Sequence, residues 1–193
     1  MTMNIVRSEL ILGGQKSGKS RRAELLARTW LDASRQHRAV LIATARPWDE
    51  EMRQRIVRHQ TDRAERVPGM TTVEEPLALA EAIGQASTQD TLVVVDCLTL
   101  WLTNLLMPAS AEANRPAAPL ESAQTGPLLM VIARAPGPVI LVGNEIGLGV
   151  IPMGREVRAF VDALGRLNQD VAGACQRVTL MAAGLPLTLK DIP

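Results

Sequence analysis

The chain has 193 residues, 47% of them hydrophobic and 21% charged, which suits a single globular domain with a complete core. A formal net charge of +1, three Trp, one Phe and no Tyr argue against a nucleic-acid surface or an aromatic platform for bases. No apolar run reaches the roughly 18 residues of a membrane span, and the first residues lack a signal-peptide core. We therefore expect a cytoplasmic protein that binds no nucleic acid.

Strands and helices alternate along the first part of the chain. Residues 10–12 form an apolar run that ends at two glycines, which predicts a buried strand and a turn, followed by a helix over 18–32. Residues 39–43 predict a second strand. Asp49 is a good N-cap for the next helix because its carboxylate can accept a backbone N–H. Pro76 then opens another predicted helix.

The same alternation continues to the end. Residues 92–96 are the most strand-like segment, and residues 108–127, rich in Ala, Pro and Ser, are interpreted as a flexible surface loop. The other predicted elements are helices over 98–107, 130–135 and 158–176, a strand over 139–142, and an antiparallel hairpin with strands over 178–181 and 187–189. This order predicts an α/β fold with a mostly parallel sheet, flanked by helices on both faces. Ligands of such sheets bind beyond the carboxyl ends of the strands.

The first strand end carries a phosphate-binding motif. Its residues match G-x-x-x-x-G-K-[ST]: Gly13, Gly14, Gln15, Lys16, Ser17, Gly18, Lys19 and Ser20. Glycines let backbone N–H groups approach phosphate oxygens, and the next helix presents its positive end. We expect Lys19 to reach the β- and γ-phosphates and the Ser20 hydroxyl to hold Mg²⁺. The alternative is a glycine-rich structural turn. Together with the alternation of strands and helices, the motif predicts a P-loop NTPase fold of the RecA-like type.

Asp96 ends the strand over 92–96, which we expect to lie next to the first strand. A carboxylate there is the expected second partner of Mg²⁺. The alternative role is the N-cap of the helix at 98, and one residue could serve both.

His59 is a candidate nucleophile. It lies on the helix after the second strand, one turn after Arg55 and close to Arg58 and Arg63. A neutral imidazole can attack phosphorus, and arginines would stabilise the phosphoryl charge. From spacing alone, a partly exposed helix histidine without a chemical role is the favoured interpretation. The other histidine, His37, is expected on the solvated surface.

Asn144 and Glu145 follow the strand over 139–142 in a glycine-rich turn. Polar residues at a strand end suggest ligand contact, and a mobile connecting loop is the alternative. The two cysteines, Cys97 and Cys175, lack zinc-site spacing and are expected to be buried thiols.

These segments together resemble the adenosylcobinamide kinase/adenosylcobinamide-phosphate guanylyltransferase family of cobalamin biosynthesis. The resemblance covers almost the whole chain, and its most specific blocks are Asp-Cys-Leu-Thr-Leu-Trp from Asp96 and Asn-Glu-Ile-Gly-Leu-Gly from Asn144. It implies phosphorylation of adenosylcobinamide with ATP or GTP, and transfer of GMP from GTP to the resulting phosphate. It also suggests a small homo-oligomer such as a trimer.

The resemblance further implies site residues. A histidine on the helix after the second strand carries GMP covalently in the family, and His59 matches it. The implied nucleotide contacts are Ala43, Thr44, Ala45, Gln60, Arg63 and Glu74. The chain departs from the family pattern at Met70, where tryptophan is common, and at Gly143, where serine or threonine is usual. Two other functions stay open: a P-loop kinase or NTPase without guanylyl transfer, and a nucleotide-binding regulatory module.

Overall fold

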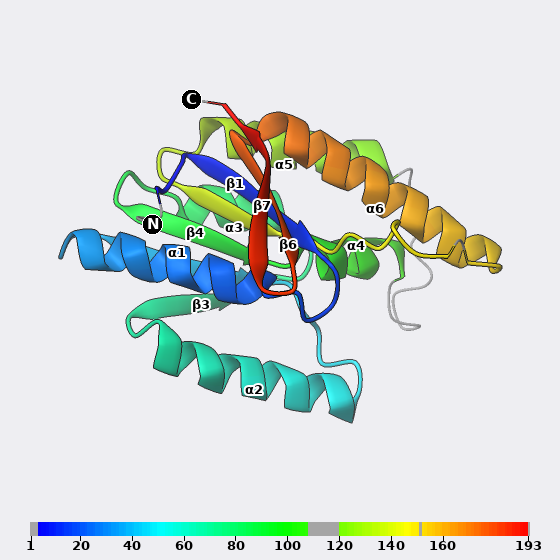
Figure 1. Ribbon diagram of the computed structural model, residues 1–193, viewed down its shortest axis with the longest axis horizontal. Helices are drawn as coiled ribbons and strands as arrows, with labels where there is room; N and C mark the ends of the chain where they lie inside the picture. Colours follow the sequence, from blue (N-terminus) through cyan, green and yellow to red (C-terminus); the bar gives the residue numbers. More distant parts are fainter. Residues whose placement is uncertain (1–3, 108–119, 151, 193) are drawn as a thin grey trace.

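The computed structural model describes residues 4–107, 120–150 and 152–192 and places them in one seven-stranded α/β sheet with helices on both faces (Figure 1). The strands are β1 (Ser8–Gly13), β2 (Arg38–Ala43), β3 (Met70–Glu74), β4 (Thr91–Asp96), β5 (Val139–Val142), β6 (Arg177–Ala182) and β7 (Leu185–Asp191). The helices are α1 (Lys19–Ala33), α2 (Glu50–Arg66), α3 (Leu79–Ala86), α4 (Leu98–Leu106), α5 (Leu120–Arg134) and α6 (Arg155–Ala174).

The sheet order is β3-β2-β4-β5-β1-β6-β7. All neighbouring strands pair in parallel except β6 and β7, which form the antiparallel hairpin that the sequence predicts. One expectation is wrong: β4 does not lie next to β1, because β5 is inserted between them. Asp96 is therefore two strands from the phosphate loop, about 10 Å at the usual spacing.

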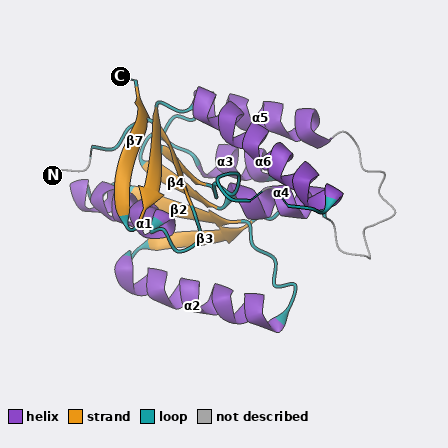
Figure 2. Ribbon diagram, turned by 45° about the vertical axis from the view of Figure 1, so that its right-hand side comes forward, coloured by secondary structure: helices purple, strands orange, loops and turns teal. Residues whose placement is uncertain are grey.

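Alternate residues of the central strands face two separate cores. Leu10, Val93 and Leu141 pack with buried residues of α3, α4, α5 and α6. Ile11, Val94 and Ile140 point to the other face and pack with buried residues of α1. Because side chains alternate across a strand, a sheet covered on both faces needs the continuous apolar runs seen in this sequence. Figure 2 shows α3 to α6 together on one side of the sheet.

Several element boundaries differ from prediction. β3 was not predicted, because Thr71, Thr72 and Glu74 give it no apolar run, and it forms by pairing with β2. The loop predicted over 108–127 is wrong for its last part, since α5 begins at Leu120 and includes Pro127. Residues 108–119 lie outside the described part. Helix α5 is held by burial of its later side chains, Leu128 and Ile132, in the core.

Two further helices also begin elsewhere than predicted. Helix α3 starts at Leu79 rather than at Pro76, because Glu75 Oε1 first accepts the backbone N–H groups of Leu77 and Ala78. Helix α6 begins at Arg155, three residues before the predicted start, and ends at Ala174. Helix ends depend on local caps, which apolar periodicity does not report.

Helix α2 lies outside the main body, along the β3 edge and next to α1 (Figure 1). Asp49 caps it as predicted, with Oδ1 accepting the Met52 N–H at 2.7 Å. Arg63 is its one buried residue among those described. Its C-terminal end is tied to α1 by Arg66, whose Nη1 lies 3.1 Å from Glu24 Oε2, and by Arg28, which donates to the Arg66 carbonyl.

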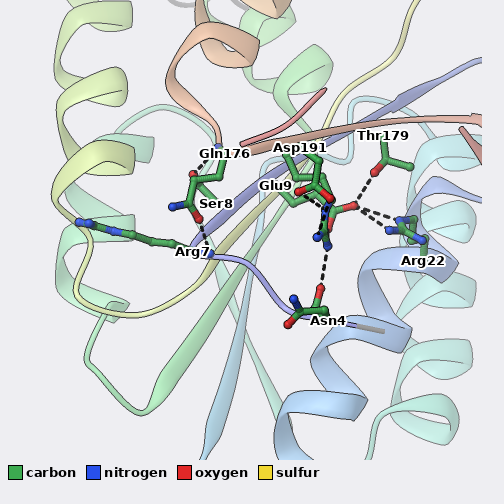
Figure 3. Close-up of polar contacts among 9 residues, drawn as sticks. Asn4, Arg7, Ser8, Glu9, Arg22, Gln176, Thr179 and Asp191 are labelled. Carbon is green, nitrogen blue, oxygen red and sulfur yellow. Dashed lines mark hydrogen bonds and ion pairs between the residues drawn. The ribbon is translucent and has the colours of Figure 1, made fainter. Parts of the chain in front are cut away.

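A buried carboxylate joins the β6–β7 edge of the sheet to α1 (Figure 3). Glu9, on β1, is completely buried and its Oε1 accepts hydrogen bonds from Arg22 Nε at 3.0 Å and Thr179 Oγ1 at 2.7 Å. Arg177 lies 3.8 Å from Glu9 Oε2 and also pairs with Asp191 at 3.1 Å. One carboxylate thus links α1, β1, β6 and, through Arg177, β7.

No helix in the described part of the chain is long and apolar enough to cross a membrane.

Candidate functional site

The phosphate loop joins β1 to α1 with a backbone that requires glycine. Gly13 has φ +152° and Gly18 has φ +99°. A Cβ at Gly13 would lie 2.5 Å from the Met181 carbonyl oxygen and 2.6 Å from Ser17 Oγ. No side chain fits there, so the first glycine of the motif is fixed by contact with β6 as well as by its own dihedral angles.

Lys19 folds back over this loop. Its side chain is almost buried, and Nζ donates to the Gly14 carbonyl at 2.6 Å and lies 3.5 Å from Ser17 Oγ. Burial lowers the pKa of Lys19, and the Arg55 charge lowers it further, while Cys97 and Asp96 act in the opposite direction. An ammonium group held by two neutral oxygens is poorly compensated, so an anionic phosphate is a favourable partner.

Asp96 stands at the carboxyl end of β4, and the N-cap position of α4 belongs to Cys97, which makes no side-chain capping bond. The capping alternative for Asp96 is therefore wrong. Within the described residues, no group of three or more His, Cys, Asp or Glu side chains is placed to hold a metal. Ser20 and Asp96 are a hydroxyl and a carboxylate, donors that suit Mg²⁺ when phosphate oxygens and water supply the remaining ligands.

Thr44, after β2, is completely buried and bonded within the protein. Its hydroxyl donates to the Cys97 carbonyl at 2.7 Å and accepts the Cys97 N–H at 2.9 Å. Asn104 of α4 donates to the Thr44 carbonyl at 2.7 Å. Thr44 thus clamps the ends of β2 and β4 together. A nucleotide contact in the segment from Ala43 to Ala45 stays a prediction, and the hydroxyl of Thr44 is already engaged.

Helix α2 and strand β3 bring three of the predicted residues together. Gln60 Nε2 lies 3.5 Å from Glu74 Oε1, and Arg63 Nη2 lies 3.4 Å from Thr72 Oγ1. His59 is exposed on the same helix. Arg55 precedes His59 by one turn, and its positive charge contributes to lowering the pKa of Lys19. His37, by contrast, stacks on Trp30 before β2, at the amino end of the sheet, and is half-buried rather than solvated.

The sheet order sets the dimensions of the site. From β1 to β3 there are four strand steps, about 19 Å at the usual spacing. The candidate site therefore has two parts: an inner part with Lys19, Ser20 and Asp96, and an outer part with Gln60, Arg63 and Glu74. A nucleotide that spans them would place its phosphates at the loop and its base at the β3 edge.

Two supports of the loop were not predicted as site residues. The turn between β6 and β7 bonds to the loop, with the Gly184 N–H donating to the Ser17 carbonyl at 3.0 Å. The turn after β5 is fixed by Thr99 Oγ1, which accepts the Asn144 N–H, and by Asn168 Nδ2, which donates to the Asn144 carbonyl. The sequence signal for the turn after β5 was the pair of polar residues, Asn144 and Glu145, at a strand end, whereas no local pattern indicated the contact of Gly184 with the loop.

Comparison with known proteins agrees with this geometry. The family model "Cobinamide kinase / cobinamide phosphate guanyltransferase" matches residues 9–189. The bifunctional adenosylcobalamin biosynthesis protein CobP of Pseudomonas aeruginosa is 45% identical over 188 residues, covering 96% of this chain and 98% of that protein. The corresponding CobU protein of Escherichia coli is 34% identical over 187 residues, covering 94% and 98%.

Solved structures share the fold at low identity. The flagellar accessory protein FlaH of Methanocaldococcus jannaschii matches with a TM-score of 0.52 and 11% identity, covering 96% of this chain and 79% of that one. A protein of Pyrococcus horikoshii OT3 matches with a TM-score of 0.54 and 11% identity, covering 99% and 89%. The predicted α/β fold, with a mostly parallel sheet and an antiparallel C-terminal hairpin, is confirmed.

Proposed function

The chain belongs to the cobinamide kinase/cobinamide phosphate guanyltransferase family, and we propose that it performs both reactions at one nucleotide site. In the first, ATP or GTP phosphorylates the aminopropanol hydroxyl of adenosylcobinamide. In the second, GMP passes from GTP to that phosphate, giving adenosylcobinamide-GDP and pyrophosphate. The observation that carries this proposal is the match of the family model to residues 9–189, which include the phosphate loop and the helix α2 that bears His59.

The phosphate loop holds the triphosphate in both reactions. Lys19 binds the β- and γ-phosphates, and Ser20 and Asp96 would hold Mg²⁺, which would supply charge stabilisation to the leaving phosphates. Within the described part of the chain, the ammonium group of Lys19 makes its hydrogen bonds to the neutral oxygens of Gly14 and Ser17. A phosphate would replace these neutral partners with a charged one, which supports this role.

His59 is the covalent carrier in guanylyl transfer. An imidazole nitrogen bonds to the α-phosphorus of GTP as the α–β bridging bond breaks, and pyrophosphate leaves with the electron pair. An oxygen of the cobinamide phosphate then bonds to the same phosphorus as the nitrogen–phosphorus bond breaks, and the electron pair of that bond returns to the imidazole nitrogen, which restores neutral His59. Two in-line displacements retain configuration at phosphorus. The outer residues Gln60, Arg63 and Glu74 hold the guanosine part.

We further propose a homo-oligomer, with a trimer as the form that the family resemblance favours. Strand β7 has one unpaired edge and exposes Leu185, Leu187 and Leu189 on one face, an apolar surface that a second copy would cover. The reaction belongs in the cytoplasm, where GTP and ATP are supplied. Mass measurement of the native protein tests the assembly: a monomer at micromolar concentration contradicts it.

Two measurements test the activities. Wild-type protein given adenosylcobinamide, GTP and Mg²⁺ is expected to yield the phosphate and then adenosylcobinamide-GDP, identified by mass. With α-labelled GTP, wild-type protein is expected to acquire acid-labile label and His59→Ala none. Undiminished label on His59→Ala refutes the histidine role. Full turnover by His59→Ala with phosphate as the only product indicates a simple kinase, and GTP binding without any product indicates a regulatory module.

A further inference from the structure

Glu145 occupies the central strand end of the inner site. It follows β5, the strand that lies between β1, which leads to Lys19 and Ser20, and β4, which ends in Asp96. Its N–H donates to the Gly13 carbonyl at 3.1 Å, so its backbone is attached to the first residue of the phosphate loop. The Asn144 contacts with Thr99 and Asn168 fix the same turn from the other side. Glu145 is half-buried, and Oε1 accepts the Gly147 N–H at 2.9 Å, which leaves other lone pairs of the carboxylate free to accept.

The two reactions differ in their need for a base. In the kinase reaction the acceptor is a neutral hydroxyl, which must lose a proton as its oxygen bonds to phosphorus. In guanylyl transfer the acceptor is a phosphate, which is already ionised at neutral pH. A general base at the acceptor side would therefore serve the first reaction and not the second.

Glu145 differs from the other acidic residues at the carboxyl ends of the strands in its position and in its hydrogen-bond partners. Asp96 is assigned to Mg²⁺. Glu75 is occupied by the N–H groups of Leu77 and Ala78, and Glu74 lies on β3, about 19 Å from β1 at the usual strand spacing. Glu145 follows β5, the strand adjacent to β1, and its backbone N–H donates to the Gly13 carbonyl of the phosphate loop.

The segment after Glu145 also suits the acceptor side. It runs outward past α4 to the start of α6, yellow in Figure 1. Its described residues include Leu148, Val150 and Met153, which are 80%, 96% and 95% exposed. A polypeptide covers at most about 3.6 Å per residue, so Leu148 lies within roughly 11 Å of Glu145. An acceptor with a large, partly apolar body could rest on these side chains while its hydroxyl meets Glu145.

We propose that Glu145 is the general base of the kinase reaction. This rests on the proposed function. The acceptor hydroxyl oxygen bonds to the γ-phosphorus, its proton passes to the Glu145 carboxylate, and the bond from the γ-phosphorus to the β–γ bridging oxygen breaks. The nucleoside diphosphate leaves with that electron pair, stabilised by Lys19. The protonated Glu145 then returns its proton to water.

Glu145→Gln tests the proposal because glutamine keeps an oxygen for the Gly147 N–H and loses basicity. Each variant is assayed separately for phosphorylation of adenosylcobinamide and for GMP transfer to adenosylcobinamide phosphate supplied ready-made. Glu145→Gln is expected to lower kcat for phosphorylation by about 10²- to 10⁴-fold. GMP transfer is expected to stay within about threefold of wild type, a small change in barrier. Glu145→Asp is expected to recover part of the phosphorylation rate.

The matched control is Glu156→Gln, in the exposed first turn of α6, where both activities should stay unchanged. The acid limb of the phosphorylation pH profile should disappear in Glu145→Gln and remain in Glu156→Gln. Unchanged phosphorylation by Glu145→Gln overturns the proposal. Equal loss of both activities also overturns it, because that pattern indicates a structural role for the turn. A wild-type protein inactive in both assays contradicts the proposed function instead.

Discussion

Single residues decide whether the phosphate loop can form. Gly13 and Gly14 are adjacent in the motif, but their surroundings differ: a Cβ at Gly13 meets Met181 and Ser17, whereas nothing lies within 4 Å of a Cβ at Gly14. Only Gly13 also has a positive φ. The motif requires glycine at position 13 and leaves position 14 open, and the contact of Gly13 with β6 together with its positive φ gives the physical reason for that difference.

Gly13→Ala is expected to destabilise the protein by about 1–3 kcal/mol, since the clash involves backbone and not a flexible chain end. Gly14→Ala is the control and should leave the thermal midpoint within about 1–2 °C of wild type, the shift expected for a few tenths of a kcal/mol. Thermal unfolding without nucleotide measures both. Equal midpoints for the two variants would show that β6 can move away from the loop.

The two thiols give the protein a defined alkaline limit. Burial raises the pKa of Cys97 to about 11 and that of Cys175 to about 12, from 9.0. The folded state therefore binds more protons than the unfolded state between pH 9 and 12, so the stability that the buried thiols contribute is complete below pH 9 and falls as pH rises.

At pH 7.5 a disulfide reagent should find no rapidly reacting thiol in native protein and two after denaturation. A double variant, Cys97→Ala and Cys175→Ala, should lose less stability above pH 9.

At the scale of elements, the two helices that carry predicted catalytic residues differ in burial: α1, with Lys19, has five buried residues, whereas α2, with His59, has one. Its interior side is polar, with Arg63 as the one buried residue among those described, so few apolar contacts oppose its local opening. The ion pair of Arg66 with the buried Glu24 fastens only its C-terminal end. His59 therefore depends on polar contacts for its position.

Arg66→Ala is expected to speed amide hydrogen exchange in the last two turns of α2, because Glu24 and Asp62 both lose their ion-pair partner. Arg53→Ala on the same helix removes only an exposed pair with Glu50, and exchange at the C-terminal turns should be unchanged. Exchange detected by mass spectrometry distinguishes them. Identical exchange in Arg66→Ala and wild type would indicate that other contacts anchor the helix.

Elements without an apolar pattern were also those that the sequence did not reveal. Strand β3 exposes Thr71, Thr72 and Glu74, and it exists because β2 offers its backbone edge. The first turns of α5 lie in a segment rich in Ala, Pro and Ser, so composition favoured a loop. The spacing of apolar residues indicates only which side chains are buried. Strand β3 instead depends on backbone pairing with β2, and α5 depends on the burial of its later residues, Leu128 and Ile132.

At the scale of the whole molecule, Glu9 connects the sheet to the helix that follows the phosphate loop. It is fully buried and joined to Arg22, Arg177 and Thr179 (Figure 3). Removing one member of a buried charged group leaves its partners without compensation, which costs more than losing an exposed pair.

Glu9→Ala is expected to lower the free energy of unfolding by about 3–5 kcal/mol. Asp191→Ala removes the partly exposed partner of Arg177 and should cost about 1 kcal/mol or less. Urea unfolding compares the two variants under one set of conditions. Equal losses would mean that Glu9 contributes no more than a surface ion pair.

The sequence by itself determined the P-loop motif, the α/β class and the family, because these depend on local spacing and on continuous apolar runs. It also determined which residues, such as His59 and Asp96, carry suitable chemistry. Only the tertiary structure decided that β5 separates β1 from β4, and hence that Glu145 lies beside the phosphate loop. Strand order in a parallel sheet is set by long crossover connections and packing between distant residues, and no local pattern encodes it.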